Sequence, residues 1–519
     1  MPDRPLDHVV IVGGGTAGWL TAGILAADYR AGDPSGIRVT LVESPDVAIL
    51  GVGEGTWPSL RDTLQRIGID EFDFLRRCSA SFKQGSRFDG WVSGAANDSY
   101  LHPFDGLPSQ DDVDPLSLWR VAPEGSAFAD AVSAQAALCK LDLAPKQSRT
   151  PAYAAVANYA YHLDAPALAD LLREHCIRRL GVRHVRDDMV DVARAEDGSV
   201  RALRLKQAGE LAGDLFVDCT GSRALLINRE MGACLTDVSS ILFNDSALAV
   251  QVPYSDAHQP IPSQTSATAM PAGWVWDIAL QTRRGVGHVF SSRHMDEADA
   301  RERLTGYLNR AAPGAGVTGQ DARLIRFRSA YRETPWTGNV VAIGMSQGFV
   351  EPLEASAIVM IELSAIMLSD TLPPRTDGFS LAARRFNERF SYRWARIIDF
   401  LKLHYVLSQR LEPYWAEHRR RDTWPDRLAE LVNQWRSAPP ARDDFPQTQE
   451  IFPAASYAYV LYGMGFKTER RSHPRRQEGA ERARRRYDEI TLRRQRMLAG
   501  LPTNRALLEQ VCAQSLSST

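Results

Sequence analysis

The sequence predicts an α/β fold in which a parallel sheet with flanking helices precedes a mainly helical module. The apolar stretch 8–12 has the length and composition of a buried strand, and an Ala/Leu-rich helical stretch follows at 18–29. A second strand is expected at 38–43. Two later apolar stretches, 215–219 and 340–343, lead into glycine and are expected to join the same sheet. Strands alternating with helices in this way build parallel sheets.

The helical module is predicted from the pattern beyond residue 380. Five apolar residues recur there at helical spacing with arginines on the other face: Phe386, Phe390, Trp394, Ile397 and Leu401. We interpret this stripe as core packing, because one apolar face opposite a charged face is typical of a helix lying on a protein interior. The stretch 370–378 has the Pro and Gly residues of a linker. The predicted modules are therefore 1–375 and 376–519.

The composition is that of a large globular enzyme. The 519 residues include 61 Lys and Arg against 63 Asp and Glu, a formal net charge of −2, and 44% of them are hydrophobic. No apolar run reaches the roughly 20 residues of a bilayer-spanning helix, and the first twelve residues do not read as a signal peptide. The six cysteines form no CxxC pair, which argues against a zinc site and a disulfide framework. We expect a cytoplasmic protein with no metal site and no membrane segment.

One segment departs from this even charge. Residues 467–496 contain twelve Lys and Arg against five Asp and Glu. Contact with nucleic acid is one interpretation of such a basic segment. The acidic residues between the arginines favour another, a solvent-exposed helix with ion pairs along it. We therefore expect no nucleic-acid partner.

A glycine-rich turn follows the first strand. Residues 13–18 read Gly-Gly-Gly-Thr-Ala-Gly, a G-x-G-x-x-G pattern that opens the first helix. Glycine lets the backbone approach a pyrophosphate, and the N–H groups at the helix start then point at the anion. Glu43 ends the next strand, where a carboxylate can accept hydrogen bonds from a ribose diol. The predicted contacts to a dinucleotide are Gly13, Gly15, Thr16, Ala17, Gly18 and Glu43.

Two later strands decide between FAD and NAD. The stretches 214–221 and 338–344 each read as a strand ending in glycine, and the second leads into residues 345–358. Two late strands returning to one nucleotide fold suit an FAD that lies extended across the sheet, as in Rossmann-like modules of the glutathione-reductase type. Ordinary strand-end glycines are the alternative. The further FAD contacts that we expect are Gly221, Gly344, Met345 and Ile358.

Several segments together resemble the flavin-dependent halogenases of the tryptophan-halogenase type. Three motifs are specific to that family: Phe-Lys-x-Gly at 82–85, Trp-x-Trp-x-Ile at 274–278, and Glu-Pro-Leu-Glu at 351–354. Other matching stretches are shared more widely among flavoproteins. The resemblance spans residues 8–465 and also rests on 13–19, 43–44, 51–58, 161–164, 218–221, 348–350, 399–400 and 404–405.

The resemblance implies a flavin-binding α/β module and a mainly helical module that together form the substrate pocket. It implies that a separate flavin reductase supplies FADH2, and that O2 converts it to a flavin C4a-hydroperoxide. A bound chloride or bromide attacks this species to give hypohalous acid. The acid then travels through an internal tunnel to an aromatic substrate held away from the flavin.

Lys83 matches the lysine of this family. Hypohalous acid is small and indiscriminate, so control over the reacting position needs one donor group beside the substrate. An ammonium inside the protein can hydrogen-bond and polarise the oxidant, or form an N–halogen species. A surface lysine is the alternative, and the nearby Phe82, Phe88 and Trp91 argue against it.

Glu354 matches the glutamate of the family. Electrophilic aromatic substitution passes through a cation that must lose a proton, and a carboxylate close to Lys83 would stabilise the cation and take that proton. Glu351 is the rival and is interpreted as structural. The alternative for Glu354 is a carboxylate favoured by a helix dipole.

The resemblance places the halide at the turn after Glu354, on backbone N–H groups of Ser356 and Ala357. That turn reads Ser-Thr-Gly in the family and Ala355-Ser-Ala357 here. The backbone donors survive the change, so a halide is still expected to bind. Bromide preference is a hypothesis, which competing turnover of chloride and bromide tests.

Trp274 and Trp276 match indoles thought to keep the flavin from oxygenating the substrate directly. The family has a proline three residues after the second tryptophan, and this chain has Ala279. The chain therefore lacks the fixed backbone angle that proline would impose at this position. Plain core aromatics are the alternative.

His102 and Phe104 match positions where flat side chains sandwich an indole, with ordinary packing as the alternative. Residues 456–466 contain three tyrosines but no evident clamp for the carboxylate and amine of free tryptophan. Indole or another small electron-rich ring is therefore as plausible a substrate as tryptophan.

Two other functions are compatible with parts of the sequence. A two-component aromatic monooxygenase would use the same flavin chemistry without halide, but it has no need of a buried Lys83. A flavin-binding module for nucleic acid or protein would use the basic segment 467–496. His162 and Asp164 are interpreted as structural. The oligomeric state is left open, with a homodimer as one alternative.

Overall fold

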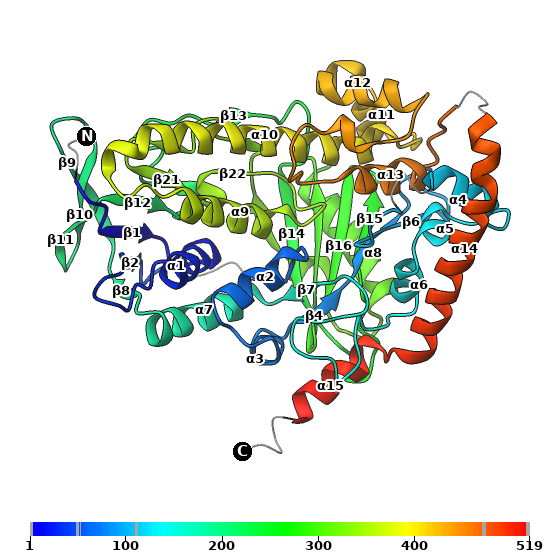
Figure 1. Cartoon of the computed structure of the whole chain (residues 1–519), viewed down its shortest axis with the longest axis horizontal. Helices are drawn as coiled ribbons and strands as arrows, with labels where there is room; N and C mark the ends of the chain where they lie inside the picture. Colours follow the sequence, from blue (N-terminus) through cyan, green and yellow to red (C-terminus); the bar gives the residue numbers. More distant parts are fainter. Residues whose placement is uncertain (1–3, 48–50, 52, 109–112, 470–473, 515–519) are drawn as a thin grey trace. The chain divides into compact units, whose positions relative to one another are not determined.

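The computed structural model describes residues 4–47, 51, 53–108, 113–469 and 474–514 (Figure 1). Val52 of the matching stretch 51–58 and residues 470–473 of the basic segment lie outside the described residues. The chain forms two units, each from three stretches. Unit 1 takes residues 1–79, 163–238 and 328–394, and unit 2 takes residues 80–162, 239–327 and 395–519. Residue 375 falls in the third stretch of unit 1, and the sequence-based division after it stays a prediction.

The main sheet of unit 1 has six strands in the order β20-β21-β12-β1-β2-β8. β1 (His8–Val12) pairs in parallel with β2 (Arg38–Glu43) and with β12 (Leu215–Asp218). All residues of β1 are buried, which explains its continuous apolar run. α1 (Thr16–Asp28) connects β1 to β2, and α7 (Ala165–Arg179) and α9 (Ser356–Thr371) pack against it. The α/β prediction is confirmed.

Unit 1 contains further short strands and helices, listed here in chain order. They are β3 (Glu54–Gly55), α2 (Ser59–Arg66), α3 (Glu71–Arg77), α7 (Ala165–Arg179), β8 (Arg183–Arg186), β9 (Met189–Arg194), β10 (Val200–Leu205), β11 (Gly209–Ala212), β13 (Thr236–Asp237), β19 (Ala330–Tyr331), β20 (Trp336–Thr337), β21 (Val340–Ala342), β22 (Gly348–Phe349) and α9 (Ser356–Thr371). Within the described residues, only helices follow β22, so the helical C-terminal part is confirmed as well.

The helix after the glycine-rich turn begins two residues earlier than the sequence predicts. Gly15 precedes it with extended dihedral angles (φ −80°, ψ −174°), and the helix starts at once with Thr16. The glycines at positions 13 and 15 therefore lie before the helix, whereas Gly18 lies inside its first turn.

The main sheet of unit 2 has seven strands in the order β18-β14-β17-β16-β15-β5-β6. Only β15 and β5 pair in parallel among the described neighbours of this sheet. Its strands are β5 (Gly85–Asp89), β6 (Ser99–Pro103), β14 (Ser246–Pro253), β15 (Thr265–Met270), β16 (Gly273–Ala279), β17 (Arg283–Phe290) and β18 (Arg323–Arg326). Outside this sheet, β4 (Ser81–Lys83) pairs antiparallel with β7 (Ala160–Leu163).

The helices of unit 2 cover this sheet and extend to the C-terminal part. They are α4 (Pro115–Val121), α5 (Phe128–Val132), α6 (Gln135–Lys140), α8 (Glu297–Ala311), α11 (Pro413–His418), α12 (Asp426–Trp435), α13 (Ala454–Gly463), α14 (Pro474–Gly500) and α15 (Asn504–Gln514). The basic segment lies mostly in α14, drawn in red in Figure 1, which runs beside α4, α5 and α6. Arg484 and Arg493 donate to carbonyls of unit 2, and Arg486 pairs with Glu489, as in the ion-paired helix that the sequence favours.

The predicted apolar stripe lies on one long helix, α10 (Phe379–Val406), and all five of its residues are buried. Its assignment to core packing is confirmed. No helix in the described residues combines the length and the apolar character needed to cross a bilayer.

Candidate active site

In unit 1, the predicted glycines lie where three turns of the chain pack closely against one another. A Cβ on Gly13, whose φ is +119°, would lie 2.2 Å from the Cys219 carbonyl oxygen at the end of β12. A Cβ on Gly344, whose φ is +79°, would lie 2.8 Å from Cβ of Ala17 at the start of α1. Glycine is required at both positions because the backbones approach closely. The turns after β1, β12 and β21 therefore meet at the N-terminus of α1, as a nucleotide site requires.

The N-terminus of α1 is open at Gly15. No side chain caps this end of the helix, and a Cβ built on Gly15 would have no other atom within 4 Å. Unsatisfied N–H groups and the positive end of the helix dipole favour an anion here. The residues present therefore fit a dinucleotide pyrophosphate, with Thr16 and Ala17 in the first turn of the helix.

Glu43 ends β2 as predicted, and its carboxylate has a partner that the sequence did not indicate. Oε2 of Glu43 lies 2.8 Å from Nε2 of His184 in β8. The Glu43 side chain also lies against Gly14, where an added Cβ would come within 2.3 Å of its Cγ. This packing holds the carboxylate next to the glycine-rich turn, where a ribose contact is predicted.

The turn after β12 is organised by a buried carboxylate. Asp218 accepts hydrogen bonds from the backbone N–H groups of Thr220, Leu226 and Ile227 and from the Thr220 hydroxyl. Gly221 follows with φ +68°, and a Cβ there would meet no atom within 4 Å. The predicted cofactor residue Gly221 is thus held in an open turn.

A small pocket of about 40 Å³ lies at the N-terminus of α9 in unit 1. It is lined by Gly344, Met345, Gly348, Phe349, Val350, Ser356, Ala357, Met360, Ile361 and Trp394. Two predicted cofactor residues and both predicted halide residues therefore share one pocket. Met345 is 43% exposed and offers an apolar surface, whereas the predicted contact Ile358 is buried. The indole nitrogen of Trp394, which lines the pocket, is buried without a hydrogen-bond partner among the described residues.

The start of α9 has the features of an anion site. Its first residues, Ser356 and Ala357, line the pocket, and no side chain caps the helix. A helix N-terminus with free N–H groups attracts anions. The backbone donors that the halide prediction requires are therefore present, although the family serine and glycine are not.

Ala355 immediately before α9 adopts a left-handed conformation, with φ 53° and ψ 41°. Alanine is disfavoured there by roughly 1 kcal/mol or more relative to glycine. We expect Ala355→Gly to raise the free energy of unfolding by about 0.5–1 kcal/mol, measured by urea denaturation. Ala357→Gly, inside the helix, is the matched control and is expected to lower it. Equal effects of the two substitutions would contradict this account.

The predicted carboxylate Glu354 lies in the turn before α9. It is 4% exposed, and Glu351 is fully buried. The indole Nε1 of Trp57 donates to the backbone carbonyl of Glu354 over 2.7 Å. Trp57 belongs to the matching stretch 51–58, and its bond anchors the turn that leads to the predicted halide residues.

Glu362, further along α9, is a buried acid that the sequence did not single out. It accepts hydrogen bonds from Thr63 over 2.6 Å and from Ser59 over 3.3 Å. Burial raises the pKa of Glu362 from 4.5 to about 8. The protonated acid therefore contributes stability that is complete below pH 4.5 and is lost as pH rises toward 8.

Glu362→Gln tests this contribution because the amide stays neutral at every pH. Between about pH 5 and pH 8, we expect wild-type stability to fall relative to the variant by up to about 1.4 kcal/mol per pH unit. Urea denaturation of both proteins across this range measures the difference. Parallel pH curves would show that Glu362 is ionised in the fold.

In unit 2, Lys83 is the last residue of β4 and is 1% exposed. Its Nζ lies 5.3 Å from the ring centroid of Phe104, another predicted site residue. The alternative of a surface lysine is therefore wrong. The two residues meet because β5 and β6 pair with Gly85 opposite Pro103.

The backbone around Lys83 is held by several side chains that the sequence did not indicate. Asn504 donates to the Phe82 carbonyl over 3.0 Å, and the Gln84 N–H donates to the Ser263 carbonyl over 2.6 Å. The Gln84 side chain donates to the Leu143 carbonyl and accepts from Gln135. These residues lie far apart in the sequence, so no local sequence pattern indicated that they meet beside Lys83. These hydrogen bonds hold the backbone on both sides of Lys83 in place.

Burial alone does not distinguish Lys83. Of the six lysines, all in the described part of the chain, Lys146 and Lys402 are buried as well. Nζ of Lys146 lies over the rings of Phe82 and Tyr159 at 5.7 and 5.1 Å. Because side chains alternate along a strand, Phe82 and Lys83 point to opposite faces of β4.

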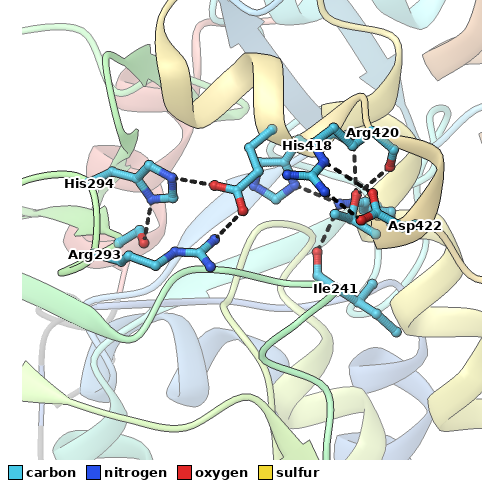
Figure 2. A network of polar contacts seen from close by, with 10 residues as sticks. Ile241, Arg293, His294, His418, Arg420 and Asp422 are labelled. Atoms are coloured by element: carbon cyan, nitrogen blue, oxygen red, sulfur yellow. Dashed lines mark hydrogen bonds and ion pairs between the residues drawn. The ribbon is translucent and has the colours of Figure 1, made fainter.

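The third buried lysine, Lys402, takes part in a network of polar contacts (Figure 2). Nζ of Lys402 donates to the Ile241 carbonyl over 3.0 Å and to Nδ1 of His418 over 2.8 Å. The His418 ring stacks on Phe243 and Tyr405 at 3.9 and 4.2 Å. Figure 2 also shows His294 and Arg293, which both pair with Glu417. We assign this lysine a packing role.

The predicted ring-stacking residue His102 is buried in β6 among aromatic side chains. Its ring lies 5.8 Å from Phe400 and 6.0 Å from Tyr459. Phe104 is half-buried one residue after the strand. Unit 2 therefore brings Lys83 and two flat side chains to the β5–β6 pair.

Trp274 and Trp276 lie in the regular strand β16 and are buried. Gly287 in β17 lies opposite Trp276, and a Cβ there would come within 2.1 Å of the indole. The strand continues through Ala279, so the missing proline falls at the end of a strand. That Trp274 and Trp276 shield a flavin stays a prediction.

The paired role of Lys83 and Glu354 also stays a prediction, because the first residue belongs to unit 2 and the second to unit 1. Each unit by itself brings together most of the residues predicted for it. Unit 1 has an open N-terminus of α1, converging glycine turns, and a pocket at the N-terminus of α9, which no side chain caps. Unit 2 has a buried ammonium beside an aromatic ring.

Comparison with known proteins gives a consistent assignment. The tryptophan halogenase family model matches residues 8–479. The tryptophan 6-halogenase ThaL of Streptomyces albogriseolus is 33% identical over 467 residues, which cover 86% of this chain and 85% of that protein. A solved structure of a tryptophan halogenase from Shewanella frigidimarina is 46% identical, with a TM-score of 0.93 and 98% of both chains covered. The tryptophan 7-halogenase RebH of Lentzea aerocolonigenes is 32% identical over 89% of this chain and 90% of its own. This chain belongs to the tryptophan halogenase family.

Proposed function

We propose that this protein is a flavin-dependent halogenase that chlorinates or brominates an electron-rich aromatic small molecule. The observation that carries the proposal is the burial of Lys83, 1% exposed, with its ammonium over the ring of Phe104. Lys146 is also buried over aromatic rings, so what distinguishes Lys83 is its place in the Phe-Lys-x-Gly stretch at 82–85, which matches the family motif. Membership of the tryptophan halogenase family supports the same reading.

Reduced FAD and O2, when bound, would supply the oxidising equivalents that turn halide into hypohalous acid. Unit 1 offers the residues to hold the cofactor: Gly13, Gly15, Thr16, Ala17 and Gly18 at the pyrophosphate, Glu43 at the ribose, and Gly221, Gly344, Met345 and Ile358 along the flavin. The open cradle at Gly15 and the exposed Met345 support this placement. A separate reductase is the proposed source of FADH2.

The proposed halide site is the start of α9. Its backbone N–H groups at Ser356 and Ala357 would hold chloride or bromide by charge–dipole attraction. The pocket that these residues line supports the placement. Bromide preference stays a hypothesis, since the side chains around these donors differ from those of the family.

Lys83 would hydrogen-bond the oxidant and direct its halogen to one ring position, and Glu354 would take the proton that the ring loses. His102 and Phe104 would hold the ring between flat faces. Indole or a tryptophan-like molecule is the proposed substrate. Relatives are named for tryptophan, but no clamp for its amino-acid group is evident here.

An aromatic monooxygenase is the alternative that the structure favours less, because hydroxylation would not need the buried Lys83. A cytoplasmic location is part of this proposal and rests on the sequence alone. The oligomeric state stays open.

Incubation with a flavin reductase, FAD, NADH and either halide, against a panel of indoles and phenols, tests the proposal. Mass spectra are expected to show the isotope pair of chlorine or bromine in the product. An added oxygen atom without halogen would support the monooxygenase instead.

A further inference from the structure

A buried histidine shares the sheet face of Lys83. In the antiparallel pair of β4 and β7, Ser81 lies opposite His162 and Lys83 lies opposite Ala160. Side chains two residues apart on a strand point the same way, so Ser81, Lys83 and His162 share one face. His162 is thus the diagonal cross-strand neighbour of Lys83, a position within reach of long side chains. The small Ala160 directly opposite leaves room for the lysine.

The His162 ring is fixed by hydrogen bonds to two other strands. Its Nε2 lies 2.8 Å from the Thr265 hydroxyl in β15, and its Nδ1 lies 3.5 Å from the Ser81 hydroxyl. Ser81 donates its own proton to the Ala279 carbonyl in β16 over 2.6 Å. The ring therefore ties the start of β4 to the main sheet of unit 2, and it is fully buried.

The surroundings of the His162 imidazole favour its neutral form. Burial, and then the Lys83 cation, hold the pKa of His162 well below its usual range, and the Ala279 backbone opposes them weakly. Among the described residues, Lys83 is the charged side chain that lowers the pKa of this ring. The strands β15 and β16 present Thr265 and a backbone carbonyl to it. A neutral ring can pack beside an ammonium without repelling it.

We propose that His162 is a positioning residue that holds the Lys83 ammonium at its working place from the same sheet face. This inference rests on the proposed function, in which Lys83 directs the oxidant. Positioning within fractions of an ångström matters because small displacements of a catalytic group cost large factors in rate. The rigid, hydrogen-bonded ring limits the volume that the lysine chain can occupy.

His162→Gln tests the inference. We expect kcat for ring halogenation to fall about 10- to 100-fold, with KM for the aromatic substrate changed less than about 2-fold. The rate of hypohalous acid formation, followed with an added trap for the free acid, is expected to stay at the wild-type value. In a Lys83→Ala background, His162→Gln is expected to have no further effect, because residues that act as a unit are not additive.

Two further variants separate positioning from folding. His288→Gln replaces another fully buried neutral histidine, in β17 of the same unit, and is the matched control with an expected wild-type kcat. Thr265→Val removes the Nε2 partner of His162 and is expected to lower kcat in the same direction by a smaller factor. Thr265→Val also carries the test if His162→Gln does not fold.

The outcomes distinguish the two proposals. Wild-type kcat in both the His162 and Thr265 variants, or a fall of equal size in His288→Gln, would overturn the positioning role. So would a further loss when His162→Gln is added to Lys83→Ala. A wild-type enzyme that forms neither hypohalous acid nor a halogenated ring would instead remove the proposed function on which this role rests.

Discussion

Lys83→Ala is expected to lower ring halogenation by about 100- to 1,000-fold, the usual cost of removing one donor aimed at the reacting atoms. The oxidant is made in unit 1 under our proposal, so hypohalous acid formation is expected to continue at the wild-type rate. FAD binding is also expected to stay unchanged. The measurement is a parallel assay of halogenated product and trapped free acid from the same reaction.

Lys146→Met is the matched control for this experiment. Lys146 is as buried as Lys83 and contacts Phe82, which points to the other face of β4. Its removal changes a buried ammonium in the same unit without touching the proposed reaction site. Activity lost equally in both variants would mean that the loss comes from removing a buried ammonium, and not from the proposed chemistry of Lys83.

Gly15→Ala is expected to weaken FAD binding by about 10- to 100-fold, or about 1.4–2.7 kcal/mol, with the apo fold intact. The φ of Gly15 is −80°, which alanine adopts freely, and the added Cβ would meet no protein atom within 4 Å. It would instead enter the space where the backbone must approach the pyrophosphate. Titration of the variant with FAD, followed by flavin fluorescence, measures the loss.

Gly18→Ala is the contrasting variant. A Cβ at Gly18 would lie 1.8 Å from the Gly13 carbonyl oxygen, so this substitution is expected to disturb the fold itself. The unfolding midpoint of the apoprotein separates the two cases. Wild-type FAD affinity in a folded Gly15→Ala protein would show that the pyrophosphate does not lie at this turn.

The sequence predicts the nucleotide-binding half well because local patterns carry its geometry. β1 and β2 have the predicted bounds, and glycines are needed where backbones approach within van der Waals distance. The start of α1 was the exception, because the turn leaves Thr16 free to begin the helix at once. The first residues of α1 show no helical spacing of apolar side chains that would mark where the helix begins.

The support of Lys83 could not be predicted from sequence. Asn504 and Gln135 reach the strands beside Lys83 from distant parts of the chain, and neither belongs to a local pattern. The His162 side chain was interpreted as structural because alternation alone shows that it faces inward, not which residue shares its face. That information comes only from the register of β4 against β7.

The sequence also gives no sign of two buried acids in unit 1. Glu362 and Glu54 are acids whose pKa burial raises to about 8 and about 7. No spacing in the sequence marks them, since burial depends on which helices cover them. The sequence shows Ala355 as a departure from the family motif, but the left-handed backbone of this residue is visible only in the structure.

The regiochemistry of the product tests the central claim most directly. The isomers that the wild-type enzyme forms from indole are compared with those that hypohalous acid forms from indole in buffer without protein. If the Lys83 ammonium directs the halogen, the enzyme gives one predominant isomer and Lys83→Ala loses that preference. An enzyme whose isomer distribution matches that of the free acid would contradict the account.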